Sequence, residues 1–590
     1  MRQEVAQATR LGRSGKNADM THPTHELVIR NGTVVDGTGG PLQSADIGID
    51  GGRITTVGEV PGSGREEIDA RDQLVAPGWV DVHTHYDGQV SWDSLIAPSS
   101  WQGVTTAVMG NCGVGFAPVA PDKHGWLIEL MEGVEDIPGT ALHEGITWEW
   151  ESFPEYLDAI GRTHFALDIG AQVPHAALRG YVMGERGGDH TEAPTADEIA
   201  SMGALAAEGI RAGALGFSTS RTVNHKSKSG AFTPSLTATA DELLGIARAV
   251  GATGLGVFEV VADLDDLDND FALIRAMSEV SGRPTSLTVL QKPGPRADEY
   301  RRILALIDQA VAAGVPMHGQ VPTRPVGLIM SLEGRVNPFV ASPTYQQLAV
   351  LSLAERVARL RDPETRGAVI AESEANQAVS PLTHFGAAFA LGDVPRYDPD
   401  PSDNIHVIAQ QTGRSVFEVA LDVLLASEGT GKLYLPVMNY ADGTMRATRE
   451  MLTNPNCAPG LGDAGAHCTL ICDASMPTFM LSYWARDASA EDRLPIEFAV
   501  KRQTADTADL VGLRDRGRLV PGARADVNVI DHDALGVGTP EMVHDLPAGG
   551  TRLVQKASGY RATVVAGAVV TRDGDDTGAR PGRLVRGAQT

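Results

Sequence analysis

Two histidines one residue apart, His83 and His85, have the types and spacing needed to hold a metal ion. The apolar run 74–82 before them, bounded by turn-forming residues, predicts a buried strand. Side chains two positions apart on a strand point to the same face, so both imidazoles should project together from the strand's C-terminal end. Neutral imidazole is a good ligand for zinc and similar divalent cations. Two surface histidines can also fall at this spacing by chance.

A thiol and a carboxylate end two further predicted strands. Cys112 closes the strand 104–112, and its thiolate could bind one metal or bridge two. The alternative, which position alone favours, is a small buried apolar side chain. Asp463 ends the strand 458–463 and could bind metal and take a proton from water. It could equally cap the N-terminus of a helix.

Eight predicted strands alternate with helical patterns through most of the chain. Repeated strand-then-helix units predict a (β/α)8 TIM barrel, an α/β fold whose chemistry lies at the C-terminal ends of the strands. The histidine pair, Cys112 and Asp463 all occupy such ends. The predicted strands cover residues 74–83, 104–112, 166–174, 213–219, 254–261, 285–291, 314–321 and 458–463.

Short strands separated by turns occur near both ends of the chain, with hairpin signals at Asn31-Gly32 and Asp50-Gly51. They predict one small composite β-sandwich domain built from both chain ends. The long stretch 330–457 is predicted to be an inserted helical subdomain over the barrel mouth. The predicted organisation is a disordered extension (1–25), sandwich (26–73), barrel strands one to seven (74–329), the insertion (330–457), strand eight with closing helices (458–514), sandwich (515–575) and a tail (576–590).

Composition limits the possible partners. The chain has 75 acidic and 49 basic residues and a formal charge of −26, which disfavours nucleic acid and membrane surfaces as partners. Four cysteines in 590 residues indicate a reducing compartment. Neither a secretory signal nor a bilayer-spanning run is apparent. We therefore expect a cytoplasmic protein, and a homo-oligomer is possible.

Several motifs resemble a known family. VIRNGTVVDG at 28–37, APGWVDVHTH at 76–85 and GARAD at 522–526 resemble the amidohydrolase superfamily. Within it, GNCG at 110–113 and GALGFST at 213–219 are similar to the N-acyl-D-amino-acid deacylase (D-aminoacylase) branch. The resemblance covers most of residues 26–575.

The resemblance implies a barrel with a composite β-sandwich and a divalent metal, most simply one or two Zn2+ ions. By position it implies that His83, His85 and Asp463 bind the metal, that Cys112 joins them and that Asp463 is the catalytic base. It further implies a metal-dependent hydrolase of linear amides, whose small-molecule substrate is an N-acyl amino acid. The preference for the D form rests on the resemblance alone.

Members of this family present histidines from strands five and six, but this chain has none there. Glu259 on strand five could supply a carboxylate ligand or form an internal salt bridge. Gln291 on strand six could offer an amide oxygen, and His318 on strand seven could compensate. Arg221 and Arg324 could each clamp a substrate carboxylate or form surface ion pairs. The metal count is therefore left open.

Two alternative functions remain at this point. The same scaffold could hydrolyse another C–N bond, such as that of a cyclic amide or imide, because the insertion would shape the pocket. A metal-free, non-catalytic scaffold is suggested by the missing histidines. The joint presence of His83, His85 and Asp463 argues against that second alternative.

Overall fold

The computed structural model describes residues 24–379, 382 and 384–587. Most of the predicted disordered extension (1–25) lies outside these residues. Its last residue, His25, already begins strand β1 (His25–Val34). The end of the predicted tail, 588–590, also lies outside them.

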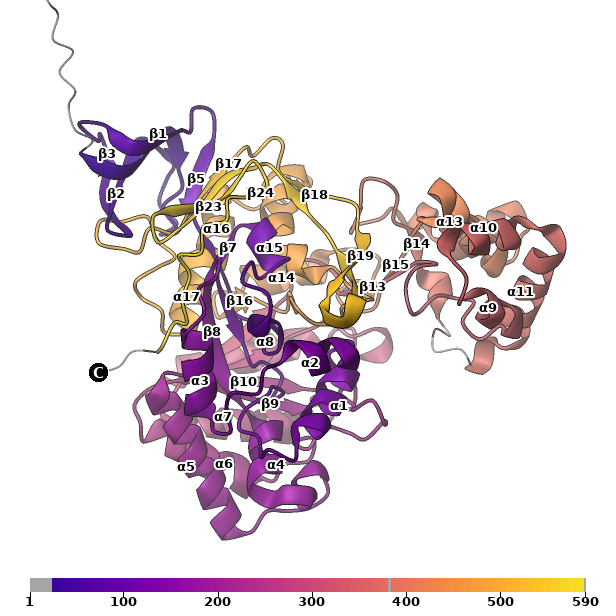
Figure 1. Cartoon of the computed structure of the whole chain (residues 1–590), viewed down its shortest axis with the longest axis horizontal. Helices are drawn as coiled ribbons and strands as arrows, with labels where there is room; N and C mark the ends of the chain where they lie inside the picture. Colours follow the sequence, from indigo (N-terminus) through magenta and orange to yellow (C-terminus); the bar gives the residue numbers. More distant parts are fainter. Residues whose placement is uncertain (1–23, 380–381, 383, 588–590) are drawn as a thin grey trace, which may run out of the picture.

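Eight parallel strands of the described chain form the barrel, in the sheet order β6 to β12 and then β16 (Figure 1). Just beyond β6 and β16, a parallel bridge between Thr84 and Ala464 joins the two ends of the sheet. The predicted (β/α)8 barrel is confirmed. Its strands are β6 (Trp79–Asp81), β7 (Val104–Met109), β8 (Asp168–Pro174), β9 (Gly216–Arg221), β10 (Val257–Ala262), β11 (Thr285–Thr288), β12 (Met317–Val321) and β16 (Cys457–Pro459).

Amphipathic helices cover the barrel, and their ends follow capping rules. In α5 (Ala196–Ala212), Thr195 and Glu198 form a reciprocal capping box, and Met202, Ala206 and Ile210 are buried. The helical pattern in the sequence predicts this helix over residues 196–212, and the structure confirms these bounds. The neighbouring helices are α6 (Ala240–Gly251), α7 (Leu267–Ser281) and α8 (Glu299–Ala312).

The predicted strand 74–83 is in fact two strands that belong to different sheets. Strand β5 (Leu74–Pro77) pairs with β1 and β17, whereas β6 starts the barrel. Gly78 separates them, and a Cβ there would lie 2.2 Å from side-chain atoms of Thr105. This close approach lets the chain pass directly from one sheet to the other, and an apolar pattern alone does not reveal it.

Both chain ends build the second sheet, in the order β24-β23-β22-β17-β5-β1-β2-β3, with β4 also paired to β1. The composite sheet predicted from the turn-rich ends is therefore present. Its remaining strands are β2 (Gln43–Asp50), β3 (Arg53–Gly58), β4 (Gly64–Asp69), β17 (Val527–Ile530), β22 (Tyr560–Val565), β23 (Ala568–Arg572) and β24 (Asp575–Asp576).

The two predicted hairpin signals behave differently. Strands β2 and β3 form a hairpin in which Gly51 and Gly52 both have positive φ, at 55° and 72°, as a type I′ turn requires. At Asn31-Gly32 the hairpin prediction is wrong, because β1 continues through it with a shift in register. A Cβ on Gly32 would lie 2.4 Å from Val75 Cγ2, so the glycine serves close packing between strands.

The segment between β12 and β16 contains a group of helices with a hydrophobic core of its own. Strand β13 (Gly327–Met330) leads into it and pairs with β15 (Leu433–Pro436), which leads out. Figure 1 shows these helices to one side of the barrel. Near their base, Arg335 Nη1 lies 2.8 Å from Asp136 Oδ1 of the β7–β8 connection. The helices are α9 (Pro343–Leu348), α10 (Leu353–Arg361), α11 (Pro363–Ala375), α12 (Ile405–Thr412) and α13 (Val416–Gly429).

The described part of the predicted tail packs against β8. Gly582 bridges Phe165, and the Val585 N–H donates to the Ile169 carbonyl at 2.7 Å. The Arg583 N–H and the Arg524 side chain both donate to Asp168 Oδ1. These residues therefore close the N-terminal end of the barrel strand.

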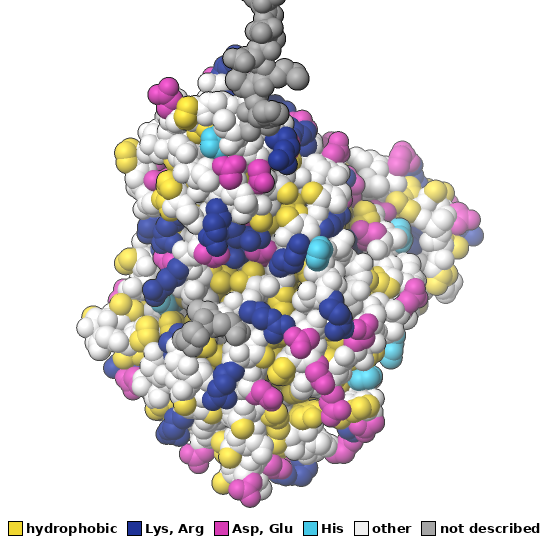
Figure 2. Space-filling view, turned by 60° about the vertical axis from the view of Figure 1, so that its left-hand side comes forward, with side chains coloured by type: hydrophobic (Ala, Val, Ile, Leu, Met, Phe, Trp, Pro, Cys, Tyr) yellow, Lys and Arg dark blue, Asp and Glu magenta, His cyan; other side chains and the backbone are white. Residues whose placement is uncertain are grey.

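Charge is not spread evenly over the surface. Figure 2 shows Lys and Arg side chains gathered across the middle of one face, with Asp and Glu more numerous below. Apolar side chains are scattered among them in small groups. In the part of the chain that the structure describes, no helix is both long enough and apolar enough to cross a membrane.

Candidate metal centre

His83 and His85 lie directly beyond β6 with both rings buried. The chain stays extended there because Thr84 donates its N–H and its hydroxyl to the Val108 carbonyl, at 3.0 and 2.9 Å. The His85 N–H donates to the Ala464 carbonyl at 2.8 Å. The two rings therefore lie on the same side of the chain, with centroids 5.5 Å apart.

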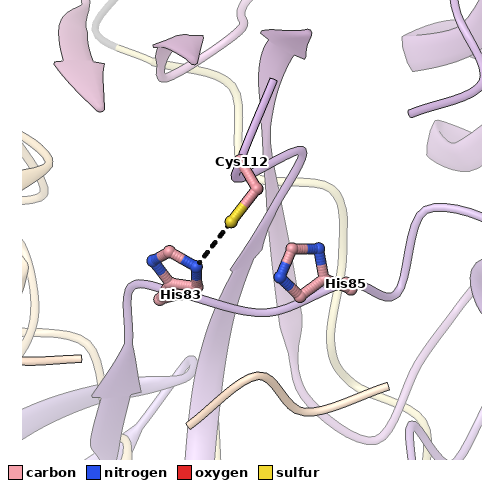
Figure 3. Close-up of side chains that lie close together, drawn as sticks. All are labelled: His83, His85 and Cys112. Carbon is pink, nitrogen blue, oxygen red and sulfur yellow. Dashed lines mark hydrogen bonds between the residues drawn. The ribbon is translucent and has the colours of Figure 1, made fainter. Parts of the chain in front are cut away.

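Cys112 joins the histidines from a tight loop after β7. Gly110, Cys112 and Gly113 all have positive φ, and a Cβ on Gly113 would lie 2.8 Å from the Thr219 Cα. The glycines thus allow the loop to pack closely against strand β9. Cys112 Sγ lies 3.3 Å from His83 Nε2 (Figure 3). Ligand atoms of the two histidines and Cys112 all lie within 4.8 Å of one another.

Asp463 reaches the same place from beyond β16. Its Oδ1 lies 3.3 Å from His83 Nε2 and 3.6 Å from His85 Nε2. Its backbone has a strained positive φ of 42°. The interpretation of Asp463 as a helix N-cap is wrong, because in the described chain the next helix begins only at Asp473.

These distances fit a tetrahedral cation. Ligands bonded at 2.0–2.3 Å to a tetrahedral ion lie about 3.3–3.8 Å apart, and the three contacts of His83 and His85 with Cys112 and Asp463 fall between 3.3 and 3.6 Å. Asp463 Oδ1 is buried without a hydrogen-bond partner among the described residues. Such an atom is costly unless a ligand satisfies it. The residues present therefore fit a divalent metal ion.

Hydrogen bonding fixes which nitrogen of His83 is free to bind. Gln320 Nε2 donates to Ser286 Oγ at 2.9 Å, which turns its Oε1 toward His83 Nδ1 at 2.8 Å. Nδ1 must then carry the proton, and the lone pair of Nε2 faces Cys112 and Asp463.

We expect Gln320→Met to weaken zinc binding about 10–100-fold, because a thioether is only a weak acceptor for the hydrogen bond from Nδ1–H that orients His83. Competition with a chromogenic chelator measures the change. Gln309→Met, on the exposed side of α8, is the control and should bind zinc as the parent does. Equal affinities in all three proteins would contradict this role for Gln320.

Burial is the largest single influence on the pKa values of His85, Asp463 and Cys112. Burial lowers the pKa of His85 to about 4, so its imidazole is neutral near pH 7. Burial alone would raise the pKa of Asp463, but the His85 and His83 rings outweigh it and hold that pKa below its usual range. Burial and nearby carboxylates raise the pKa of the Cys112 thiol. Metal uptake by the thiol should therefore release a proton.

Glu259 on β10 lies behind the Cys112 loop. Its Oε2 accepts the Cys112 N–H at 2.9 Å, while its Oε1 is buried and lacks a hydrogen-bond partner among the described residues. Burial raises its pKa to about 7. No ion pair of Glu259 is present in the described chain, so the salt-bridge alternative is wrong. The carboxylate holds the backbone of Cys112 in place and keeps one free oxygen near the centre.

Gln291 and His318, the candidates on strands six and seven, interact with residues outside the metal centre. Gln291 anchors a loop: its N–H donates to Asn439 Oδ1 at 2.7 Å, and its Oε1 accepts from the Ala441 N–H at 3.1 Å. His318 is surrounded by a different set of charges. Burial is the main cause that lowers the pKa of His318, and the charged groups that also act on that pKa are Arg502 and Asp506 rather than the residues of the metal centre.

Both candidate arginines are already paired. Arg221 lies 3.7 Å from Asp270 and donates to the Ala238 carbonyl. Arg324 is buried, lies 3.0 Å from Asp473 and stacks 3.5 Å above the Tyr397 ring. Arg324 Nε and Nη1, however, have no hydrogen-bond partner among the described residues.

Three residues near the centre carry no local sequence signal. Glu135 follows α1 (His124–Val134), and its Oε1 lies 3.4 Å from His85 Nδ1. His467 Nε2 lies 3.8 Å from the other oxygen of Glu135. His225 bonds Ser220 Oγ at 2.9 Å, and burial together with the His467 and His85 rings lowers its pKa to about 3. The unusually long β7–β8 connection that carries Glu135 was the one available hint.

Asp463 also lines a small cavity of about 30 Å3, together with Ala464, Asp473 and Arg552. A cavity of this size has room for about two water molecules. The structure therefore leaves room for water beside Asp463.

Two known proteins are similar to this chain over most of its length. D-aminoacylase of Alcaligenes xylosoxydans xylosoxydans is 28% identical over 580 residues, covering 95% of this chain and 97% of that protein. N-acyl-D-glutamate deacylase of the same organism is 27% identical over 523 residues, covering 86% and 88%.

Solved structures share the fold. A crystal structure of D-aminoacylase matches with a TM-score of 0.64 at 23% identity, covering 95% of this chain and all of that one. The N-acyl-D-glutamate deacylase of Bordetella bronchiseptica, complexed with zinc and a phosphonate inhibitor, matches with a TM-score of 0.61 at 24% identity, covering 95% and 99%. The model of the amidohydrolase family matches residues 66–571. The resemblance seen in the motifs is confirmed, and this chain belongs to the amidohydrolase family.

Proposed function

We propose that this protein is a divalent-metal-dependent hydrolase that removes the acyl group from an N-acyl amino acid of the D series. The observation that carries the proposal is the convergence of four side chains inside the barrel: ligand atoms of His83, His85 and Cys112 lie within 4.8 Å of one another, and Asp463 Oδ1 lies 3.3 and 3.6 Å from the Nε2 atoms of the two histidines. The named activities of the full-length relatives support the substrate class.

His83, His85 and Asp463 would hold the ion, with Cys112 completing the set. When bound, such a cation polarises the amide carbonyl and lowers the pKa of water at the site. Asp463 accepts the proton of the attacking water and delivers it to the leaving nitrogen. Glu259 keeps Cys112 in place through the Cys112 N–H. Zinc suits this nitrogen, sulfur and oxygen donor set.

The test is hydrolysis of a panel of linear and cyclic amides by protein loaded with zinc. N-acetyl derivatives of methionine, aspartate and glutamate, each as the D and the L enantiomer, are compared with a hydantoin, and release of the free amine is measured. We expect at least one N-acetyl-D-amino acid to be cleaved faster than its L enantiomer. Ring opening of the hydantoin without cleavage of any linear amide would instead favour the cyclic-amide alternative.

A further inference from the structure

Glu135 is a buried carboxylate that lies between two imidazoles. Its side chain is 2% exposed. Oε1 lies 3.4 Å from His85 Nδ1, and Oε2 lies 3.8 Å from His467 Nε2. No arginine or lysine among the described residues forms an ion pair with it. A carboxylate held this deeply without a basic partner calls for a specific role, because burying its charge is costly.

The backbone holds Glu135 in this position from two sides. Its N–H donates to the Met131 carbonyl at 2.9 Å, which ends helix α1, and its own carbonyl accepts the His467 N–H. The next residue, Asp136, accepts from Thr469 Oγ1 at 2.7 Å. The end of α1 is thus attached to the loop after β16 that also carries Asp463. This attachment places the carboxylate against His85 rather than in solvent.

The two nitrogens of His85 have different surroundings. Nε2 faces Asp463 Oδ1 at 3.6 Å, on the side where the ion would be held. Nδ1 faces Glu135 Oε1, and neither of these two atoms has a hydrogen-bond partner among the described residues. A histidine that binds metal through one nitrogen normally donates its other N–H to a carboxylate or carbonyl. His83 already has such an acceptor in Gln320, and Glu135 Oε1, 3.4 Å away, is the carboxylate oxygen placed to take that role for His85.

We infer that Glu135 is a positioning residue of the metal centre. It accepts the Nδ1–H of His85, fixes the tautomer whose Nε2 lone pair faces Asp463, and makes that nitrogen a stronger ligand. The inference rests on the proposed function, since it needs the ion that the centre would hold. It assigns a task to the end of helix α1, a part of the β7–β8 connection that lies beyond Cys112 and contributes no ligand itself.

The test compares zinc affinity in Glu135→Ala, Glu135→Gln and the parent, each freed of metal and titrated against a chromogenic chelator. Loss of an acceptor behind a ligating histidine typically weakens metal binding 10–100-fold, and we expect such a loss for Glu135→Ala. Glu135→Gln keeps an oxygen acceptor without the charge, so its affinity should fall between those of the parent and Glu135→Ala. Glu132→Gln is the matched control, because Glu132 lies on the same helix and pairs with Lys228 at the surface.

Thermal unfolding of the metal-free proteins separates positioning from a structural role. Glu135→Gln keeps the size of the buried side chain, so it should not destabilise the metal-free fold, whereas Glu135→Ala also leaves a cavity. A lower zinc affinity together with an unchanged melting temperature supports the inference. If Glu135→Ala does not fold, the nearly isosteric Glu135→Gln is compared with the parent instead. If Glu135→Gln and Glu135→Ala both bind zinc as tightly as the parent, the inference is wrong, but the proposed function is not affected. A parent protein that takes up no metal overturns the proposed function as well.

Discussion

The variant His83→Ala, His85→Ala will bind no metal and will lose hydrolysis, because it removes both imidazoles around which the other ligands are arranged. The expected loss of activity exceeds about 100-fold, because removing a residue that only hydrogen-bonds to a metal ligand already costs up to about that much. Metal per chain, measured on protein purified without chelator or nickel affinity, should be about one or two ions in the parent and none in the variant, in keeping with sites of one or two catalytic ions.

The control for this experiment is the variant His143→Ala, His164→Ala, which removes two exposed histidines. It should keep both metal and activity. Full metal content in the His83→Ala, His85→Ala protein would place the metal elsewhere and contradict the proposed centre. An absence of metal in the parent, even after incubation with zinc, would favour the non-catalytic scaffold.

Asp463→Asn should give the second large effect. The amide preserves the shape of the side chain but cannot accept a proton, so the hydrolysis rate should fall by about 10²–10⁴-fold, the usual contribution of a general base. The rate is measured at saturating zinc, so that a weaker metal affinity does not enter the comparison. Asp492→Asn, an exposed carboxylate near Arg449, should retain the parental rate. A rate in Asp463→Asn close to that of the parent would assign the proton transfer to another group.

Much of the fold was predictable because its signals are local. Alternating apolar strands and capped amphipathic helices predict the barrel, as the agreement for α5 illustrates. Gly78 and Asn31-Gly32 were misread for a different reason. Their roles depend on contacts with Thr105 and Val75, and these contacts exist only once distant strands have paired. A glycine that permits close packing looks the same in sequence as a glycine that permits a turn.

The residues of the candidate site likewise fall into two groups, those with a local sequence signal and those whose role depends on contacts made after folding. His83, His85, Cys112 and Asp463 each end a predicted strand, and the barrel fold brings strand ends together. Glu135 ends a helix in a long connection, and its contact with His467 spans more than half of the chain. Glu259 was identified as a candidate, but its hydrogen bond to the Cys112 backbone could not be read from residue types.

The composite sheet has a consequence for the order in which the protein is made. Strand β5 is paired on one side with β1, near the N-terminus, and on the other with β17, which begins at residue 527. On the ribosome, the edge of β5 therefore remains open while the whole barrel is being synthesised. An open strand edge favours pairing with other chains. Strand β17, which follows the barrel in the chain, covers that edge. Synthesis that stopped after the barrel would therefore release a chain with an exposed, unpaired strand edge next to a complete set of metal ligands.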